Sequence, residues 1–197
     1  MRCFTPQVAN PLARIRDAKT PKGGRFAAAG AATASVGVLA VGVALFLAPA
    51  AQAAPPTGGT LTPGSSLGGL RLGATKAQVE RRWGRAYGIC TRCPRETWYF
   101  NYYAFQPAAI GVEFESRRVV ALYTLYSPPG WRTSTGLVLG GRIADVRSRY
   151  PAVTRANCRG GYFALVLRRG GSHTVFYGLG DRLWAFALQG RDQPVCR

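Results

Sequence analysis

Histidine and acidic residues are scarce in this 197-residue chain, which has one histidine, His173, and eight Asp and Glu residues in all. A Ser–His or Cys–His catalyst would have to use His173. That residue follows Gly-Gly-Ser at the start of a predicted strand, where a solvated turn histidine is the simpler interpretation. The scarcity therefore argues against hydrolytic catalysis by a triad or dyad.

Paired carboxylates are almost absent as well. Glu113 and Glu115 lie two residues apart on a predicted strand and so on one face, as a pair for acid–base catalysis could. They also lie across a tight turn from Arg117 and Arg118, so we expect exposed charge pairs instead. The glycine clusters lack the spacing and the following helix of a phosphate-binding loop. We expect no enzyme activity and no cofactor.

Four cysteines follow residue 53, namely Cys90, Cys93, Cys158 and Cys196, and they allow three disulfide connectivities. Cys90-Thr91-Arg92-Cys93 does not precede a helix, as a thioredoxin-type dithiol would. A four-cysteine zinc site would need a second Cys-x-x-Cys pair. We therefore expect two disulfides and no metal: a local Cys90–Cys93 bridge, and Cys158–Cys196 tying the C-terminal tail to the rest.

The first 53 residues have the pattern of an export leader: a basic segment, an uncharged apolar stretch over 26–50, and Ala51-Gln52-Ala53 as a cleavage site. We expect a signal peptide cleaved after Ala53, leaving 144 residues. The alternative is an uncleaved anchor, because the apolar stretch is long enough to span a bilayer. The even number of cysteines after residue 53 also fits an oxidising, extracytoplasmic location, where they can pair as disulfides.

The remaining chain is strongly basic, with 20 Lys and Arg against 7 Asp and Glu, a net charge of +13. Such a surface favours contact with anionic envelope polymers or lipid headgroups. Export makes nucleic acid an improbable partner, and a membrane is a partner only if the leader is retained.

Two segments repeat. Residues 69–84 align without a gap with 136–151, and 112–125 align with 175–188. Each half begins with a predicted helix, the first capped by Thr75 and Gln78 and ended by Gly84, the second capped by Gly141 and ended by Pro151. Predicted strands follow at 97–105, 110–115, 119–126, 162–167, 174–177 and 183–188. We expect a flexible linker over 54–66 and an α+β domain over 67–197, with repeat 1 at 67–130 and repeat 2 at 131–197.

In this interpretation the two tandem repeats, each a helix plus a three-strand meander, form one antiparallel sheet with the helices on one face. The segment Leu70-Arg71-Leu72-Gly73-Ala74-Thr75-Lys76-Ala77-Gln78-Val79, with its short helix and meandering strands, resembles the repeat of the BamE-like/β-lactamase-inhibitor-protein superfamily. That resemblance implies an exported protein whose curved sheet holds a protein partner on its concave face.

Aromatic residues are the remaining candidates for a site. Because helices cover one sheet face only, strand alternation sends part of the aromatic set to the other face, where Tyr and Trp beside Arg are typical interface anchors. The possible binding face consists of Trp98, Tyr99, Tyr102, Tyr103, Tyr123, Tyr126, Trp131 and Trp184. We expect a non-enzymatic module that binds an extracytoplasmic protein through this face. The alternative is a basic domain that adheres to anionic envelope polymers or another anionic surface, and an extracellular enzyme is the least favoured interpretation.

Overall fold

A computed structural model describes residues 54–101 and 109–197. Within these ranges, no helix has both the length and the apolar character needed to cross a membrane. The expected leader over 1–53 lies outside the described residues.

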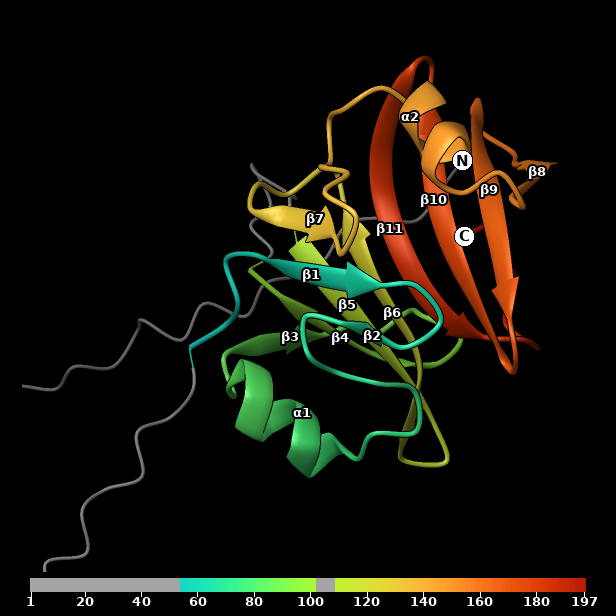
Figure 1. Ribbon diagram of the computed structural model, residues 1–197. Coiled ribbons are helices and arrows are strands. Elements are labelled where there is room, and N and C mark those ends of the chain that lie inside the picture. Colours follow the sequence, from blue (N-terminus) through green and yellow to red (C-terminus); the bar gives the residue numbers. More distant parts are fainter. Residues whose placement is uncertain (1–53, 102–108) are drawn as a thin grey trace, which may run out of the picture. The chain divides into compact units, whose positions relative to one another are not determined.

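The main element is an antiparallel sheet of eight strands, in the order β3-β4-β5-β6-β11-β10-β9-β8 (Figure 1). Strands β6 and β11 pair at its centre, through Ala121–Tyr123 and 187–189. The strands are β3 (Tyr87–Ile89), β4 (Glu96–Phe100), β5 (Ala109–Glu115), β6 (Arg118–Leu125), β8 (Thr154–Asn157), β9 (Tyr162–Arg169), β10 (Ser172–Leu179) and β11 (Arg182–Gly190).

One face of this sheet carries the larger core. A second sheet, in the order β2-β1-β7, and two helices pack there: β1 (Gly59–Thr62), β2 (Ser66–Leu67), β7 (Trp131–Thr133), α1 (Lys76–Trp83) and α2 (Ala144–Arg149). In Figure 1, β1 and β7 cross in front of β5 and β6, and α2 lies in front of β9 and β10. The core joins Leu61 of β1, Trp83 of α1 and Val146 of α2 to inward residues of the large sheet such as Phe176.

The prediction of an α+β fold made of two tandem helix-plus-three-strand repeats is wrong. Strands dominate the described chain, and the helices contain only eight and six residues. Some segments without alternating hydrophobicity are strands because they pair with segments far away in the sequence. For example, β1, which lies inside the expected linker, pairs in parallel with β7 from Gly59–Trp131 to Leu61–Thr133. Such pairing leaves no local sequence pattern.

The first helix follows its local signals. Thr75 accepts a hydrogen bond from the Gln78 N–H, and the Gln78 side chain accepts one from the Thr75 N–H, so the predicted capping box is confirmed. Gly84 ends the helix with φ 82°, which glycine adopts freely. The N-cap of the second helix is Ile143, not Gly141 as predicted, and the helix has no side-chain cap. An uncapped helix of six residues depends on packing for its stability.

Both expected disulfides are present, Cys90–Cys93 and Cys158–Cys196. The first closes the loop between β3 and β4, where no helix follows. The second joins the segment after β8 to the C-terminal tail, residues 191–197. Disulfides of this kind are typical of proteins that work outside the reducing cytoplasm.

Candidate functional site

The face of the large sheet opposite the helices is covered in its middle by the C-terminal tail. We call it the tail face. Most residues of its floor are small or β-branched, including Ala121, Val175 and Ala187, all 0% exposed; the others are Tyr123 and Tyr177. Val195 of the tail packs against this cluster. Short side chains let a chain segment lie close to the strands, so the floor is shaped for the tail.

Hydrogen bonds along the tail fix its position. The Tyr177 hydroxyl donates to the Val195 carbonyl (2.8 Å), and the Gln189 amide donates to the carbonyls of Gln193 and Pro194 (3.1 Å each). The Arg197 N–H donates to the Tyr162 hydroxyl (2.9 Å). Together with the Cys158–Cys196 bridge, these bonds attach the tail to β9, β10 and β11.

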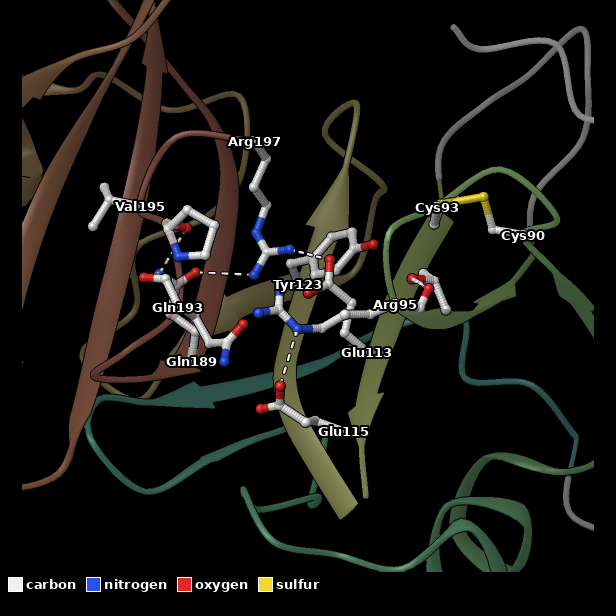
Figure 2. A network of polar contacts seen from close by, with 12 residues as sticks. Cys90, Cys93, Arg95, Glu113, Glu115, Tyr123, Gln189, Gln193, Val195 and Arg197 are labelled. Carbon is white, nitrogen blue, oxygen red and sulfur yellow. Dashed lines mark hydrogen bonds and ion pairs between the residues drawn. A yellow bond between two sulfur atoms is a disulfide. The ribbon is translucent and has the colours of Figure 1, made fainter. Parts of the chain in front are cut away.

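The Arg197 side chain then reaches across the sheet (Figure 2). Its guanidinium forms an ion pair with Glu113 of β5, donates to the Gln189 side-chain oxygen (3.0 Å) and lies 4.4 Å from the centre of the Tyr123 ring. The two charged side chains are only 20% and 14% exposed. Arg197 therefore links three strands in a setting that water screens weakly.

Two tyrosines on this face are held in their neutral form. Burial raises the pKa of Tyr177 to about 12, although the nearby Arg197 lowers it. Burial also raises the pKa of Tyr123 well above its ordinary value, and Tyr99 and Glu113 add to the effect. Neither phenol is poised to lose a proton near neutral pH, so both serve as hydrogen-bonding and packing groups rather than as bases.

Gly111 of β5 provides the space in which Tyr123 lies. A Cβ atom at this position would come within 2.5 Å of the Tyr123 ring. The Arg197 guanidinium lies 4.4 Å from the centre of the same ring, which restricts its movement. We expect Gly111→Ala to lower the free energy of unfolding by about 2 kcal/mol, measured from the urea midpoint. Gly88→Ala is the matched control, because a Cβ there meets no atom within 4 Å; an equal loss in both variants would contradict the role of Tyr123.

The structure separates the predicted aromatic set. Trp98 and Trp131 lie in the core of the helix-covered face, where Trp98 stacks on Tyr87 at 3.9 Å and Trp131 packs against Trp83. Tyr99, Tyr123 and Trp184 belong to the tail face. Tyr126 is 43% exposed and contacts Trp184 edge to face at 5.6 Å. Tyr102 and Tyr103 lie outside the described residues.

The more exposed part of the aromatic set gathers at one end of the tail face, where the tail touches it only at Tyr162 among the hydrogen bonds described above. Tyr126, Trp184 and Tyr162 form a row, with 5.8 Å between the rings of Trp184 and Tyr162. Leu179 is 48% exposed and pairs with Tyr162 across β10 and β9. We call these four residues the aromatic rim. Tyr162 and Leu179 were missed as site residues because their neighbours depend on strand order.

A β-bulge orients Trp184. The register between β10 and β11 skips this residue between the pairs Tyr177–Ala185 and Gly178–Leu183. As a result Trp184 and Ala185 both belong to the cluster on the tail face, although they are adjacent in sequence. Leu183 belongs to the opposite core, so the alternation breaks between Trp184 and Ala185. Bulges often redirect a side chain beside a functional site.

The candidate catalytic groups remain apart. Glu113 pairs with Arg197, whereas Glu115 lies 3.7 Å from Arg95, so they do not form a carboxylate dyad (Figure 2). Their expected partners, Arg117 and Arg118, form no ion pair with them among the described contacts. His173 lies on β10 at the far end from the aromatic rim. Within 54–101 and 109–197, no three His, Cys, Asp or Glu side chains are grouped as metal ligands would be.

No protein-family model matches this chain. No curated protein matches it either. Two solved structures are similar: an extracellular protein containing a SCP domain from Bacillus anthracis str. Ames, and a DUF4309 family protein (YjgB) from Bacillus subtilis subsp. subtilis str. 168. Each is 14% identical with a TM-score of 0.43. The matches cover 61% of this chain and 44% of the first structure, and 60% of this chain and 79% of the second.

At this identity and TM-score, the likenesses carry no argument about function. Neither structure is described as a BamE-like or β-lactamase-inhibitor protein, so the resemblance drawn from the sequence gains no support.

Proposed function

We propose that this protein is an exported, non-enzymatic module that binds a protein partner at the aromatic rim of its tail face. The rim combines an exposed tyrosine, a half-buried tryptophan and an exposed leucine on one surface. Rigid aromatic side chains of this kind carry much of the binding energy in protein interfaces. Export is supported by the leader pattern and by the two disulfides.

The observation that carries the proposal is the backbone that holds the rim in place. Tyr126 and Ser127 both have positive φ, 55° and 50°, a conformation that residues other than glycine adopt at a cost of about 1 kcal/mol or more each. Ser127 secures it by donating two hydrogen bonds to the Trp184 carbonyl, from its N–H (3.0 Å) and its hydroxyl (2.8 Å). The strained segment thus keeps Tyr126 exposed against the bulge residue Trp184.

Strain and a bulge at the same place are difficult to explain by stability alone. A tyrosine that served only for packing would be more stable when turned inward, on a regular strand. Irregular backbone of this type occurs preferentially at functional sites. The tail contacts the rim at Tyr162, whose hydroxyl accepts a hydrogen bond from the Arg197 N–H, whereas Tyr126 and Leu179 remain 43% and 48% exposed.

Adhesion to anionic envelope polymers is the second candidate, and the net charge of +13 over 54–197 favours it. The two functions differ in salt dependence. Polyanion adhesion weakens steeply as ionic strength rises, whereas an interface anchored by aromatic rings weakens little. The apolar character of the rim therefore favours the protein partner.

The test is capture with a photo-crosslinking residue at Tyr126 of the oxidised 54–197 domain, from the host's envelope and extracellular fractions, at 50 mM and 500 mM salt. We expect a discrete protein adduct at both salt concentrations. Trp184→Ala should reduce its yield at least tenfold, because removal of an aromatic anchor typically costs about 2 kcal/mol.

The control variant is Val138→Ala, which removes an exposed apolar side chain (53% exposed) outside the rim and should leave the yield unchanged. The proposal fails if no discrete adduct forms, if Trp184→Ala and Val138→Ala behave alike, or if capture disappears at 500 mM salt.

A further inference from the structure

The end of the tail face opposite the aromatic rim contains a pocket of about 340 Å³. Arg168, Gly170, His173 and Arg191 line it. Arg168 of β9 and His173 of β10 are direct cross-strand partners, beside the hairpin turn that joins these strands. They point to the tail face, because Val166 and Val175, two residues away on each strand, belong to its cluster.

Backbone contacts bring the third side chain to the pocket. The Arg191 N–H donates to the Gly171 carbonyl (3.2 Å), and its guanidinium donates to the Gly170 carbonyl (2.7 Å). Arg191 is thereby fixed against the hairpin turn while the rest of its guanidinium remains available. An arginine held by its own backbone and by a neighbouring carbonyl loses little conformational freedom on binding a ligand.

The charge in this pocket is not neutralised. Across 54–101 and 109–197, neither Arg168 nor Arg191 belongs to any ion pair. Asp192, next in sequence to Arg191, is the one carboxylate that acts on His173, and it is exposed. Gln189, the partner of His173 on β11, is uncharged. The two positive charges of Arg168 and Arg191 therefore lie beside the His173 ring, and the exposed Asp192 is the nearby negative charge that partly offsets them.

His173 is a polar side chain at the edge of this pocket. Its Nδ1 atom is buried and has no hydrogen-bond partner in the described chain, so this side of the ring gains nothing from within the fold. The side chain as a whole is half-buried, and the ring lines the pocket. When protonated, the exposed part of the imidazole can donate a hydrogen bond to an oxyanion there.

We propose that this pocket binds an oxyanion of the phosphate or sulfate class, with Arg168 and Arg191 as its charge partners and His173 as a hydrogen-bond donor. Guanidinium groups match the oxygens of such anions with paired N–H donors. The ligand is either a free ion or the same group carried on a polymer. The site is independent of the aromatic rim, which lies at the other ends of β9, β10 and β11.

Binding at this pocket is linked to protonation of His173. Burial lowers the pKa of His173, Arg168 and Arg191 lower it further, and Asp192 raises it. A bound anion would offset the two arginines and stabilise the imidazolium, so it would raise the pKa. By the same linkage, the anion binds more tightly as the pH falls through the pKa of His173.

His173 is the only histidine of the chain, so its imidazole gives a single NMR signal that reports on the site directly. The experiment is a pH titration of this signal in the oxidised 54–197 domain, with sodium sulfate or with sodium chloride at the same ionic strength. Sulfate is the probe because it does not itself titrate near neutral pH. We expect sulfate to raise the pKa of His173 by about 1 unit in a saturable manner.

Arg168→Gln and Arg191→Gln should each remove most of this sulfate-induced rise, whatever the pKa of the variant without sulfate. Arg147→Gln, which changes an exposed arginine on α2, is the matched control and should retain the full rise. An equal effect of sulfate and chloride, or a full rise in the Arg168 and Arg191 variants, would overturn the proposal.

A further arm distinguishes the two sources of the anion, by comparing inorganic phosphate with a polyphosphate chain at equal phosphorus concentration. Tighter binding of the chain assigns the pocket to a polymer-borne group, and equal binding assigns it to the free ion. If neither phosphate probe shifts the His173 signal in the wild-type domain, the site does not exist.

Discussion

Replacing Cys158 and Cys196 together by serine is expected to lower the free energy of unfolding by about 4 kcal/mol, the loop-closure value for a bridge that spans tens of residues. This bridge joins residues 38 apart in sequence. For a domain of this size, the melting temperature should fall by roughly 10 °C. Denaturant and thermal unfolding followed by circular dichroism provide the measurement.

The control for this variant is the second bridge of the same domain. Cys90 and Cys93 are three residues apart, so replacing both by serine should cost only about 2 kcal/mol. Equal losses for the two double variants would contradict the expected dominance of the long bridge.

Loss of the long bridge should also be visible locally. The tail covers Ala187 and Val175, and neither side chain is exposed to solvent in the structure. Without Cys158–Cys196, the tail is held by hydrogen bonds, by the packing of Val195 and by the Arg197 contacts, so it should open in partial unfolding events. We expect faster amide hydrogen exchange at Val195 and at the strand residues beneath it, while β4 and β5 retain their protection at the same denaturant concentration.

The sequence predicts those features of this fold that depend on neighbouring residues. The capping box at Thr75 and Gln78 needs only four residues in order, and it is present. The strands from 109 to 125 and from 162 to 190 follow from runs of alternating or continuous apolar residues. The bridge between Cys158 and Cys196 follows from the small number of cysteines and from their spacing.

Features that depend on distant pairing were not predictable. β1 lies in a segment rich in Gly, Pro and Thr, and only its pairing with β7 makes it a strand. For the same reason, the sequence did not show that Trp98 and Tyr99 belong to different sides of the sheet. Alternation places these neighbours on opposite faces, but the sequence does not say which face the helices cover. The bulge at Trp184 then places the neighbours Trp184 and Ala185 on the same face, which a simple alternation does not predict.

Arg197 shows the limit most clearly, because its role depends on three strands that are remote in sequence. Glu113, Gln189 and Tyr123 come together only once β5, β6 and β11 are paired. A single arginine in a chain with many arginines carries no signal of its own. What distinguishes it is the adjacent Cys196, whose bridge brings the tail to the sheet.

Arg197→Ala is expected to lower the free energy of unfolding by about 3 kcal/mol. Breaking a fully buried ion pair costs about 3–5 kcal/mol, since the remaining charge has no partner. The partial exposure of these side chains, 20% and 14%, moves the expected value to the lower end of that range. The variant also loses the contact with the Tyr123 ring and the hydrogen bond to Gln189.

A double-mutant cycle isolates the ion pair from the other losses. Glu113→Ala alone should cost about 2 kcal/mol, and the double variant should cost about 1.5 kcal/mol less than the sum of the two single variants. The matched surface pair is Asp181 and Arg182, whose side chains are 77% and 64% exposed, and its coupling should stay below about 0.5 kcal/mol. Urea unfolding at pH 7 and at two salt concentrations measures both cycles.

The two cycles decide how the tail is held. If the Arg197–Glu113 coupling energy is large and changes little with salt, the Arg197 guanidinium attaches the tail to β5, β6 and β11. The tail is then held over the sheet by an ion pair as well as by a disulfide. A coupling as small as that of the surface pair would leave the Cys158–Cys196 bridge as the sole strong attachment. Reduction alone would then release the tail from the middle of the tail face, which hydrogen exchange at Val195 would report.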